Sequence, residues 1–183
     1  MTEIHRSEHV RRTEFLGREF LTWMMARSAR DRESFTLPSG ETFDVVFERV
    51  VTLDGQNPAK DRSVLKVDEP TESEEVRLSL RLGKQVSVAR VNLIHEGREF
   101  HLTIHGADLG LRGIRLPETE GDDPGATMSF RMDLCDQVEA LLQGLFLSFI
   151  RIRLDPEAWE REMASIGRWV DNLPGTDPGD DGG

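Results

Sequence analysis

The chain has 183 residues, of which 37% are hydrophobic and 31% are charged, and its formal net charge is −11. This length suffices for one sizeable core, and the modest hydrophobic fraction predicts that some segments lie outside it. The single cysteine, Cys135, excludes an intramolecular disulfide and a zinc site built from several cysteines, and it is typical of a reducing compartment. We interpret Cys135, which lies in an apolar-rich helix, as a buried and inert thiol.

The acidic residues are concentrated in two segments. Residues 117–125 contain four acids and no base, and residues 155–183 contain eight acids and two bases. The rest of the chain is nearly neutral, while residues 1–32 and 84–116 each carry a charge of +2. These small excesses permit a phosphate-binding face but do not by themselves indicate one.

The first predicted element is a helix over residues 13–30. Leu16, Phe20 and Met24 recur at the spacing of one helix face, so this helix must bury a bulky apolar stripe. Residues 1–12 contain no apolar run typical of a signal peptide, and we expect them to be flexible. No segment has the length and apolarity of a membrane span, so we expect a cytoplasmic protein without a membrane partner.

Two strands and a short helix are predicted next. Residues 43–53 alternate between apolar and polar side chains, and residues 63–67 form a shorter strand. Thr71 and Glu74 match a capping box, and Gly83 supplies a C-terminal stop. We therefore expect a helix over 72–82, although its alternating apolar residues would also suit a strand.

Residues 85–105 give the clearest β signal, a hairpin whose loop is Glu96–Gly97. If His95 pairs with Arg98, one face becomes almost wholly apolar and the other polar, which supports both the register and the pattern. The predicted apolar pairs are Leu93 with Phe100, Val91 with Leu102, and Ala89 with Ile104. Residues 108–116 predict a further edge strand, kinked by Gly110 and Gly113.

Two helices complete the predicted domain. Residues 127–154 carry a broad apolar stripe, and Gly144 within them indicates a close approach or a slight kink. Asp155–Pro156 then has the pattern of an N-cap followed by proline at the first helical position. We expect a single α+β domain over 13–170, with a small antiparallel sheet packed against the N-terminal helix and the long C-terminal helix. Residues 171–183 are predicted to be a disordered acidic tail.

The sequence contains no recognisable catalytic or cofactor motif. His101 and His105 would lie roughly 13 Å apart along one strand, and His95 would face the other way, so we expect no metal site. The glycines of residues 106–113 match neither nucleotide-binding pattern, so we expect no cofactor and no enzyme. We interpret the two strand histidines as surface groups, with a phosphate-contacting face shared with Arg90 as the alternative.

The basic residues near the first helix and the hairpin are the candidates for contact with DNA. They lie at helix ends or beside the polar face of the hairpin, where they form either a solvated surface or a set of phosphate contacts. The candidates are Arg11, Arg12, Arg18, Arg27, Arg30, Lys84 and Arg90.

Six segments, taken in order, resemble the C-terminal half of the recombination-associated protein RdgC family. They are FLGREFLTW (15–23), GETFDVVFER (40–49), SVLKVDEPTESEEVRLSLRLGKQVSVARVNL (63–93), REFHLTIHG (98–106), GIRLP (113–117) and DLCDQVEALLQGL (133–145). The resemblance implies an α+β, nucleoid-associated homodimer that encircles duplex DNA with little sequence preference and limits the strand-exchange recombinase. It also implies a short family member or a detached C-terminal module.

We therefore expect a recombination-associated protein that binds duplex DNA weakly and without sequence specificity. The alternative is an acidic protein–protein interaction module that meets a recombinase or another protein and never binds DNA. DNA binding through phosphates must weaken steeply with salt, and this separates the two hypotheses.

Overall fold

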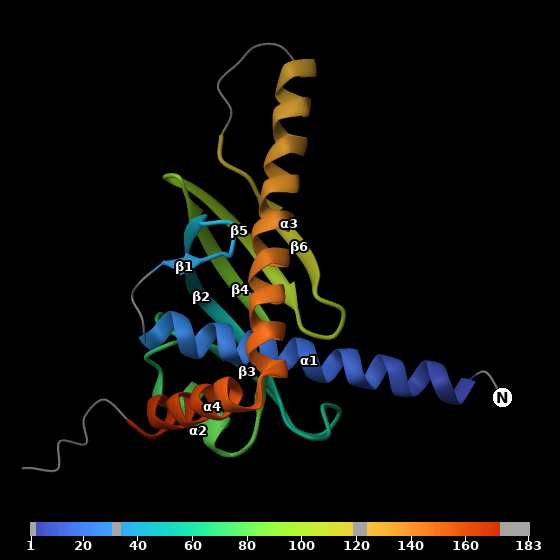
Figure 1. Ribbon diagram of the computed structural model, residues 1–183, viewed down its shortest axis with the longest axis vertical. Helices are drawn as coiled ribbons and strands as arrows, with labels where there is room; N and C mark the ends of the chain where they lie inside the picture. The colour runs from blue at the N-terminus through green and yellow to red at the C-terminus, as the bar shows by residue number, and fades with distance from the viewer. Residues whose placement is uncertain (1–2, 31–33, 119–123, 173–183) are drawn as a thin grey trace, which may run out of the picture.

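The computed structural model describes residues 3–30, 34–118 and 124–172, with side chains from Leu16 onward except that of Pro124. This part of the chain has the α+β architecture that the sequence predicts (Figure 1). Its elements are α1 (Glu3–Arg30), β1 (Phe35–Thr36), β2 (Thr42–Asp54), β3 (Arg62–Lys66), α2 (Glu74–Arg81), β4 (Gln85–His95), β5 (Arg98–His105), β6 (Gly110–Arg115), α3 (Pro124–Leu154) and α4 (Pro156–Asp171).

The strands form one antiparallel sheet in the order β1-β2-β4-β5-β6, and β3 pairs with β2. The predicted hairpin register is confirmed at every pair, from His95 with Arg98 to Ala89 with Ile104. Glu96 and Gly97 both have positive φ angles, of 50° and 75°, as a tight two-residue hairpin turn requires. The hairpin therefore forms the centre of the sheet, and β6 forms one edge.

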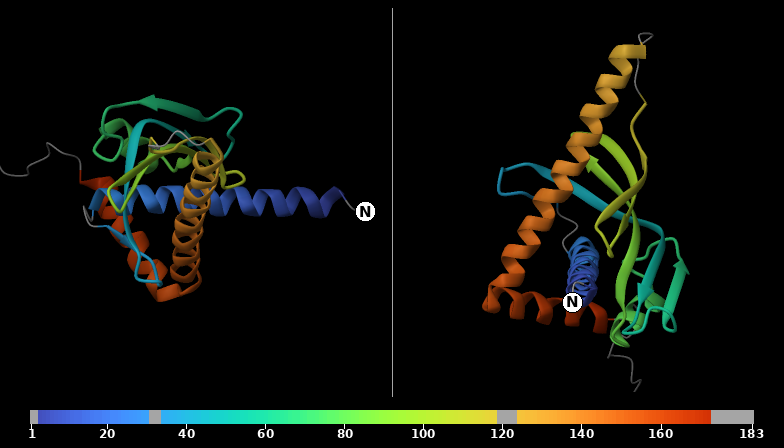
Figure 2. Two further views of the ribbon diagram at one scale, coloured as in Figure 1. Left: turned by 90° about the horizontal axis from the view of Figure 1, so that it is seen from above. Right: turned by 90° about the vertical axis from the view of Figure 1, so that its right-hand side faces the viewer.

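The helices α1, α3 and α4 cover one side of the sheet. Seen along the axis of α1, the sheet, α3 and α4 surround this helix (Figure 2). The apolar stripe of α1 is core, as predicted: Phe20, Trp23 and Met24 are at most 2% exposed. We call the side of the sheet that faces these helices the inner face and the opposite side the outer face.

Backbone contact between α1 and the end of β5 explains a glycine within a helix. A Cβ atom on Gly17 would lie 1.9 Å from the carbonyl oxygen of Gly106. Gly106 is itself held by a hydrogen bond of 2.7 Å from its amide to the carbonyl of Ser87 in β4. Any side chain on Gly17 would therefore push α1 away from the sheet.

A second close approach confirms the expectation for Gly144. A Cβ atom there would lie 2.9 Å from Cδ1 of Leu37, in the turn between β1 and β2. The glycine lets this turn lie directly against α3.

The N-terminal boundary differs from the prediction. α1 begins at Glu3 rather than at residue 13, so most of the segment expected to be flexible is helical. Residues 3–12 contain neither proline nor glycine, and nothing in that sequence stops a helix from continuing toward the N-terminus. The predicted acidic tail beyond Asn172 and most of the acidic loop before α3 lie outside the described residues.

The cap of α2 also differs from the prediction. The helix lies within the expected range and stops before Gly83, whose φ angle is 84°. Its N-cap, however, is Ser73, whose hydroxyl accepts a hydrogen bond of 3.4 Å from the amide of Val76. The capping box centred on Thr71 was therefore wrong, and the carbonyl of Thr71 instead accepts a hydrogen bond of 3.2 Å from Arg77.

The start of α4 is confirmed. Asp155 is its N-cap and accepts hydrogen bonds of 3.1 Å from the amides of Glu157 and Ala158. At the C-terminal end of α4, two arginines of α2 donate to its last carbonyls: Arg77 to Asn172, and Arg81 to Val170 and Asp171.

None of the described helices has both the length and the apolarity that a membrane span needs.

Candidate nucleic-acid interface

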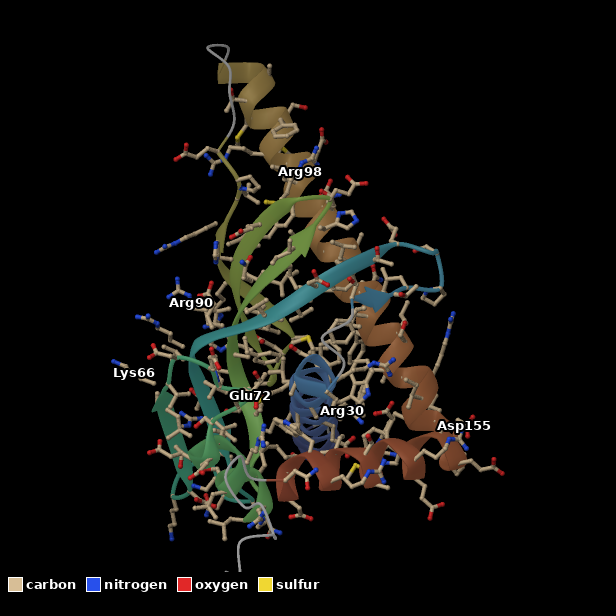
Figure 3. The ribbon with its side chains drawn as sticks, turned by 90° about the vertical axis from the view of Figure 1, so that its left-hand side faces the viewer. Arg30, Lys66, Glu72, Arg90, Arg98 and Asp155 are labelled. Atoms are coloured by element: carbon tan, nitrogen blue, oxygen red, sulfur yellow. The ribbon has the colours of Figure 1, made fainter. Side chains whose placement is uncertain are left out.

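Arg27 and Arg30, two of the predicted DNA-binding residues, join α1 to α4. Both donate to the carboxylate of Glu162, at 3.2 and 3.0 Å, and Arg30 also contacts Ser165. The guanidinium of Arg27 lies 5.7 Å from the ring centre of Trp23. Figure 3 places Arg30 on the inner side of the sheet, where α1 and α4 pack. These arginines are therefore part of the helical layer.

Lys84 is also engaged within the fold. Its ammonium lies 2.7 Å from a carboxylate oxygen of Asp61 and 2.8 Å from the hydroxyl of Ser63. Its side chain is only 15% exposed. Lys84 therefore joins the start of β4 to the loop before β3.

Arg18 lines a cavity of about 400 Å³ that also contains Asp54, Arg62 and His105. Asp54 is 3% exposed and accepts hydrogen bonds of 2.8 and 3.1 Å from Arg62. Burial acts to raise the pKa of Asp54, but hydrogen bonds from Arg62 and Ser87 and the charges of Arg62 and Arg18 outweigh it and leave that pKa lowered. The positive charge of Arg18 therefore helps to lower the pKa of the buried Asp54 carboxylate.

The remaining candidates are Arg11, Arg12 and Arg90. The side chains of Arg11 and Arg12 lie outside the described part of the protein, and only their place within α1 is given. The N-terminal part of α1 extends beyond the sheet (Figure 1). Arg90 points away from the helices on the outer face, as does Lys66 (Figure 3). Among the candidates with described side chains, Arg90 is therefore the one that a central strand carries on its outer face. Arg18 comes from α1 and lines a cavity together with His105 of that face, so the predicted set does not form one surface.

The outer face gathers polar side chains from three neighbouring strands. On β5, His101, Thr103 and His105 alternate with buried apolar residues. Residues paired directly across an antiparallel sheet project to the same face, so the strand register identifies their outer neighbours. On β4 these are Asn92, Arg90 and Val88, and on β6 they are Arg115, Arg112 and Gly110.

A bulge in β6 places two arginines side by side on this face. Arg112 and Arg115 are three residues apart, and in a regular strand they would point to opposite faces. Their partners, however, are Thr103 and His101, two residues apart, so β6 contains one extra residue between them. Gly113 allows this because its φ angle is 60°, and Ile114 points to the inner side, where it lines an apolar cavity.

Arg112 and Arg115 are not among the basic residues that the sequence predicted to contact DNA. The available signal was Gly113 within a predicted strand, which favours a bulge as well as a kink. A bulge reverses the face of every residue after it, and the arginine spacing of three then becomes a same-face spacing. The glycine showed where the strand was irregular, but only the register showed what the irregularity does.

Acidic side chains neutralise the part of the outer face nearest β2. Glu48 accepts from Arg90 at 2.6 Å and contacts Nδ1 of His101. Glu99 lies 3.6 Å from Nε2 of the same histidine and accepts a hydrogen bond of 3.1 Å from Asn92. Arg90 and His101 therefore already have carboxylate partners, with which a bound phosphate would have to compete.

The β6 edge of the outer face is less neutralised. Arg112 lies 3.6 Å from Asp108, and both side chains are at least 60% exposed, so solvent weakens this pair. Arg115 is exposed and has no ion pair among the described residues. Positive charge available to an external anion is thus greatest at Arg112 and Arg115.

The histidines occupy the faces that the sequence predicts, because His101 and His105 lie on the outer face and His95 on the inner one. His95 is 5% exposed, and its Nδ1 lies 3.0 Å from the side-chain amide of Gln137 in α3. In the described ranges, no group of three or more histidine, cysteine, aspartate or glutamate side chains could hold a metal ion. The outer face offers guanidinium and imidazole donors, which suit phosphate oxygens.

No protein-family model matches the chain, and a search of curated proteins found no match either.

Proposed function

We propose that the protein binds duplex DNA without sequence specificity through the outer face of its sheet. The observation that carries this proposal is the bulge at Gly113, which adds Arg112 and Arg115 to the face that already holds Arg90. Arg90, Thr103 and Arg112 form one row across three strands, so the Cα atoms of the two arginines are about 10 Å apart. Guanidinium groups in such a row suit phosphate groups, which they bind with two hydrogen bonds each.

The side chains of this face favour contact with the DNA backbone over contact with bases. Proteins that bind single strands commonly stack bases on aromatic side chains. In the described outer face, strands β4, β5 and β6 present no phenylalanine or tryptophan, since Phe100 is buried on the inner side. Phosphate contacts position a protein on DNA but carry no sequence information, so low specificity follows.

Glu48 sets the strength of this binding in our proposal. It holds Arg90 and His101 in the free protein, and an incoming phosphate must displace it or tolerate its charge. Binding is therefore weak, and Arg112 and Arg115 contribute more to it than Arg90 does.

The resemblance to the RdgC family extends the proposal to recombination. A nucleoid-associated homodimer would double the number of phosphate contacts, and occupied duplex DNA would limit access of the recombinase. The same resemblance supports a direct contact with the recombinase, which is a separate proposal.

Fluorescence anisotropy with a labelled duplex at two or more salt concentrations tests DNA binding. For the full chain and for one shortened after Asn172, we expect binding at low salt that weakens steeply as salt rises. Substituting both Arg112 and Arg115 by alanine removes two phosphate contacts, so the slope of log K against log salt should decrease by about 1.8. Absence of binding at low salt in both chains contradicts the proposal.

A matched control removes the same charge elsewhere. Arg151 in α3 and Arg161 in α4 are exposed and belong to the helical layer. The double alanine variant at these positions should bind DNA as the unmodified chain does. An equal loss in both double variants would show that net charge, and not the outer face, governs binding.

A further inference from the structure

One face of α3 is apolar along most of its length, with Glu139 as its charged member, and the fold covers only part of it. We call this face the α3 seam. It consists of residues spaced alternately by four and three, as in a helix that packs against another helix: Met128, Met132, Cys135, Glu139, Leu142 and Phe146. Leu142 is 7% exposed, whereas Met132 and Met128 are 59% and 62% exposed. The N-terminal end of α3 extends past the sheet (Figures 1 and 2), so the fold covers only the C-terminal half of the seam.

A cavity lies where the covered half of the seam ends. Its volume is about 550 Å³, and it lies between α3, α1 and the inner side of β6. Phe20, Leu111 and Ile114 form part of its apolar wall, and Cys135, Glu139 and Gln143 are its polar side chains apart from backbone groups. This volume is large enough to admit a bulky apolar side chain from outside.

We propose that the α3 seam and this cavity form a groove that binds a basic amphipathic helix of a partner protein. The open part of the seam, from Met128 to Glu139, spans about 16 Å, or three helical turns. Helices bind such grooves with apolar residues at spacings of three and four, and the flexible methionines adapt to the partner's side chains. One bulky apolar side chain of the partner would enter the cavity.

Charge complementarity specifies the basic character of the partner. Over the open part of the seam and its flanks, two carboxylates of the described residues are exposed, those of Asp136 and Glu139, against one exposed base, Arg131. Lysine or arginine beside the partner's apolar stripe would pair with these carboxylates. The same charges disfavour a second copy of this chain, because two seams in symmetric contact would bring their own carboxylates together.

This surface is distinct from the proposed DNA-binding face, although both use β6. Leu111 and Ile114 line the cavity on the inner side of β6, while Arg112 and Arg115 lie on the outer side. The bulge at Gly113 thus lets β6 place two arginines on its outer side and still place Ile114 on its inner side. Binding at the groove does not depend on the DNA proposal, so each can fail separately.

The test uses the full chain and a fluorescein-labelled synthetic helix. The probe has leucine at positions spaced three and four apart and lysine on its other positions, and a matched peptide replaces each lysine by glutamate. We expect the lysine peptide to bind at least tenfold more tightly than the glutamate peptide, measured by anisotropy. Cys135, expected from the sequence to be buried, is partly exposed and lines the groove. Because it is the single cysteine, bound lysine peptide should also slow its alkylation by iodoacetamide at least fivefold.

Two exposed residues of α3 provide a variant and its control. Met132→Glu places a charge in the open seam and should weaken the lysine peptide's apolar contact at least fivefold. Leu147→Glu makes the same kind of change at a site that is 50% exposed and lies roughly 100° around the helix from the seam, so it should leave binding unchanged. Circular dichroism would verify that both variants remain folded.

Several results would overturn this proposal. They are equal binding of the lysine and glutamate peptides, binding without protection of Cys135, and equal effects of Met132→Glu and Leu147→Glu. Sedimentation velocity adds a fourth: a dimer of the unmodified chain that Met132→Glu dissociates would show that a second copy occupies the groove.

Discussion

The two sides of the sheet use arginine in opposite ways. Among the helices, Arg30 and Arg77 are largely buried and both donate to α4 or its C-terminal end: Arg30 to the carboxylate of Glu162, and Arg77 to the carbonyl of Asn172. On the outer face, Arg112 and Arg115 are exposed, and a bulge rather than an ion pair determines where they lie. The difference teaches that a basic residue indicates a binding surface only when the fold leaves its charge available. It also predicts that substituting the arginines packed among the helices changes the free energy of unfolding, whereas substituting those on the outer face changes DNA binding.

The largest effect on stability should come from the close backbone contact between Gly17 in α1 and Gly106. Gly17→Ala places a Cβ atom against the carbonyl of Gly106 and should lower the free energy of unfolding by about 3 kcal/mol, as overpacked sites do. Gly167 in α4 has open space around its Cα, so Gly167→Ala should instead stabilise the protein by about 1 kcal/mol. Urea denaturation of both variants measures these changes, and destabilisation by both would contradict the contact at Gly17.

The next effect concerns the buried arginine that joins α2 to α4. Arg77 is 5% exposed, donates to Glu72 at 2.8 Å and lies 5.5 Å from the ring centre of Trp169. Arg77→Ala should lower the free energy of unfolding by about 2 kcal/mol, because it removes a buried side chain that packs on Trp169 together with its charged hydrogen bonds. Arg81 donates to the same helix end but is 41% exposed, so Arg81→Ala should cost much less. Both folded variants should bind DNA as the unmodified chain does.

Substitutions on the outer face should weaken DNA binding and leave the free energy of unfolding almost unchanged. The double variant Arg112→Ala, Arg115→Ala should bind duplex DNA about tenfold more weakly at low salt, equivalent to about 1.4 kcal/mol. Its free energy of unfolding should change by less than about 0.5 kcal/mol, as for exposed residues in general. Anisotropy and urea denaturation of one preparation measure both quantities. A stability loss as large as that of Arg77→Ala would remove the distinction between the two sides.

The pH dependence of stability tests the buried carboxylate at the end of β2. The pKa of Asp54 is lowered in the folded protein, so its ionised form stabilises the fold above the unfolded pKa of about 3.9. That contribution should be lost as the pH falls below about 4. The stability difference between the unmodified chain and Asp54→Asn should therefore shrink in acid. Asp68→Asn, whose ion pair with Arg49 is at least 79% exposed, should show little difference at any pH.

The smallest effect concerns the acid that competes for Arg90. Glu48→Gln removes a negative charge from the outer face and releases Arg90 and His101, so DNA binding should strengthen two- to fivefold, or by roughly 0.4 to 1 kcal/mol. Glu160→Gln removes the same charge from an exposed position on α4 and should change binding less. Similar gains in the two variants would mean that only net charge matters.

Local patterns in the sequence predicted much of the fold. The hairpin register followed from alternation of period two and from a loop of two residues, and both are local properties. Asp155 and Pro156 predicted the start of α4 for the same reason. The N-cap of α2 was wrong by two residues because Thr71 and Ser73 both suit a cap, and the contact with Arg77 decides between them.

The candidate site was harder to predict. Arg30 and Glu162 are 132 residues apart in the chain, so no local pattern reveals that they form an ion pair. The same holds for Arg90 with Glu48, which face each other only after β2 and β4 pair. The sequence predicted positive charge near the first helix and the hairpin. In the folded protein several of these charges form ion pairs with carboxylates, whereas two others, those of Arg112 and Arg115, are exposed on the outer face.

The sequence by itself therefore determined the α+β class, the central hairpin with its register, and the apolar stripe of α1, since each depends on periodicity and turn chemistry within one segment. The tertiary structure decided which basic residues remain available, where α1 must carry a glycine, and which part of the α3 seam stays open. These properties depend on contacts between segments far apart in the chain, and only the folded arrangement brings such segments together.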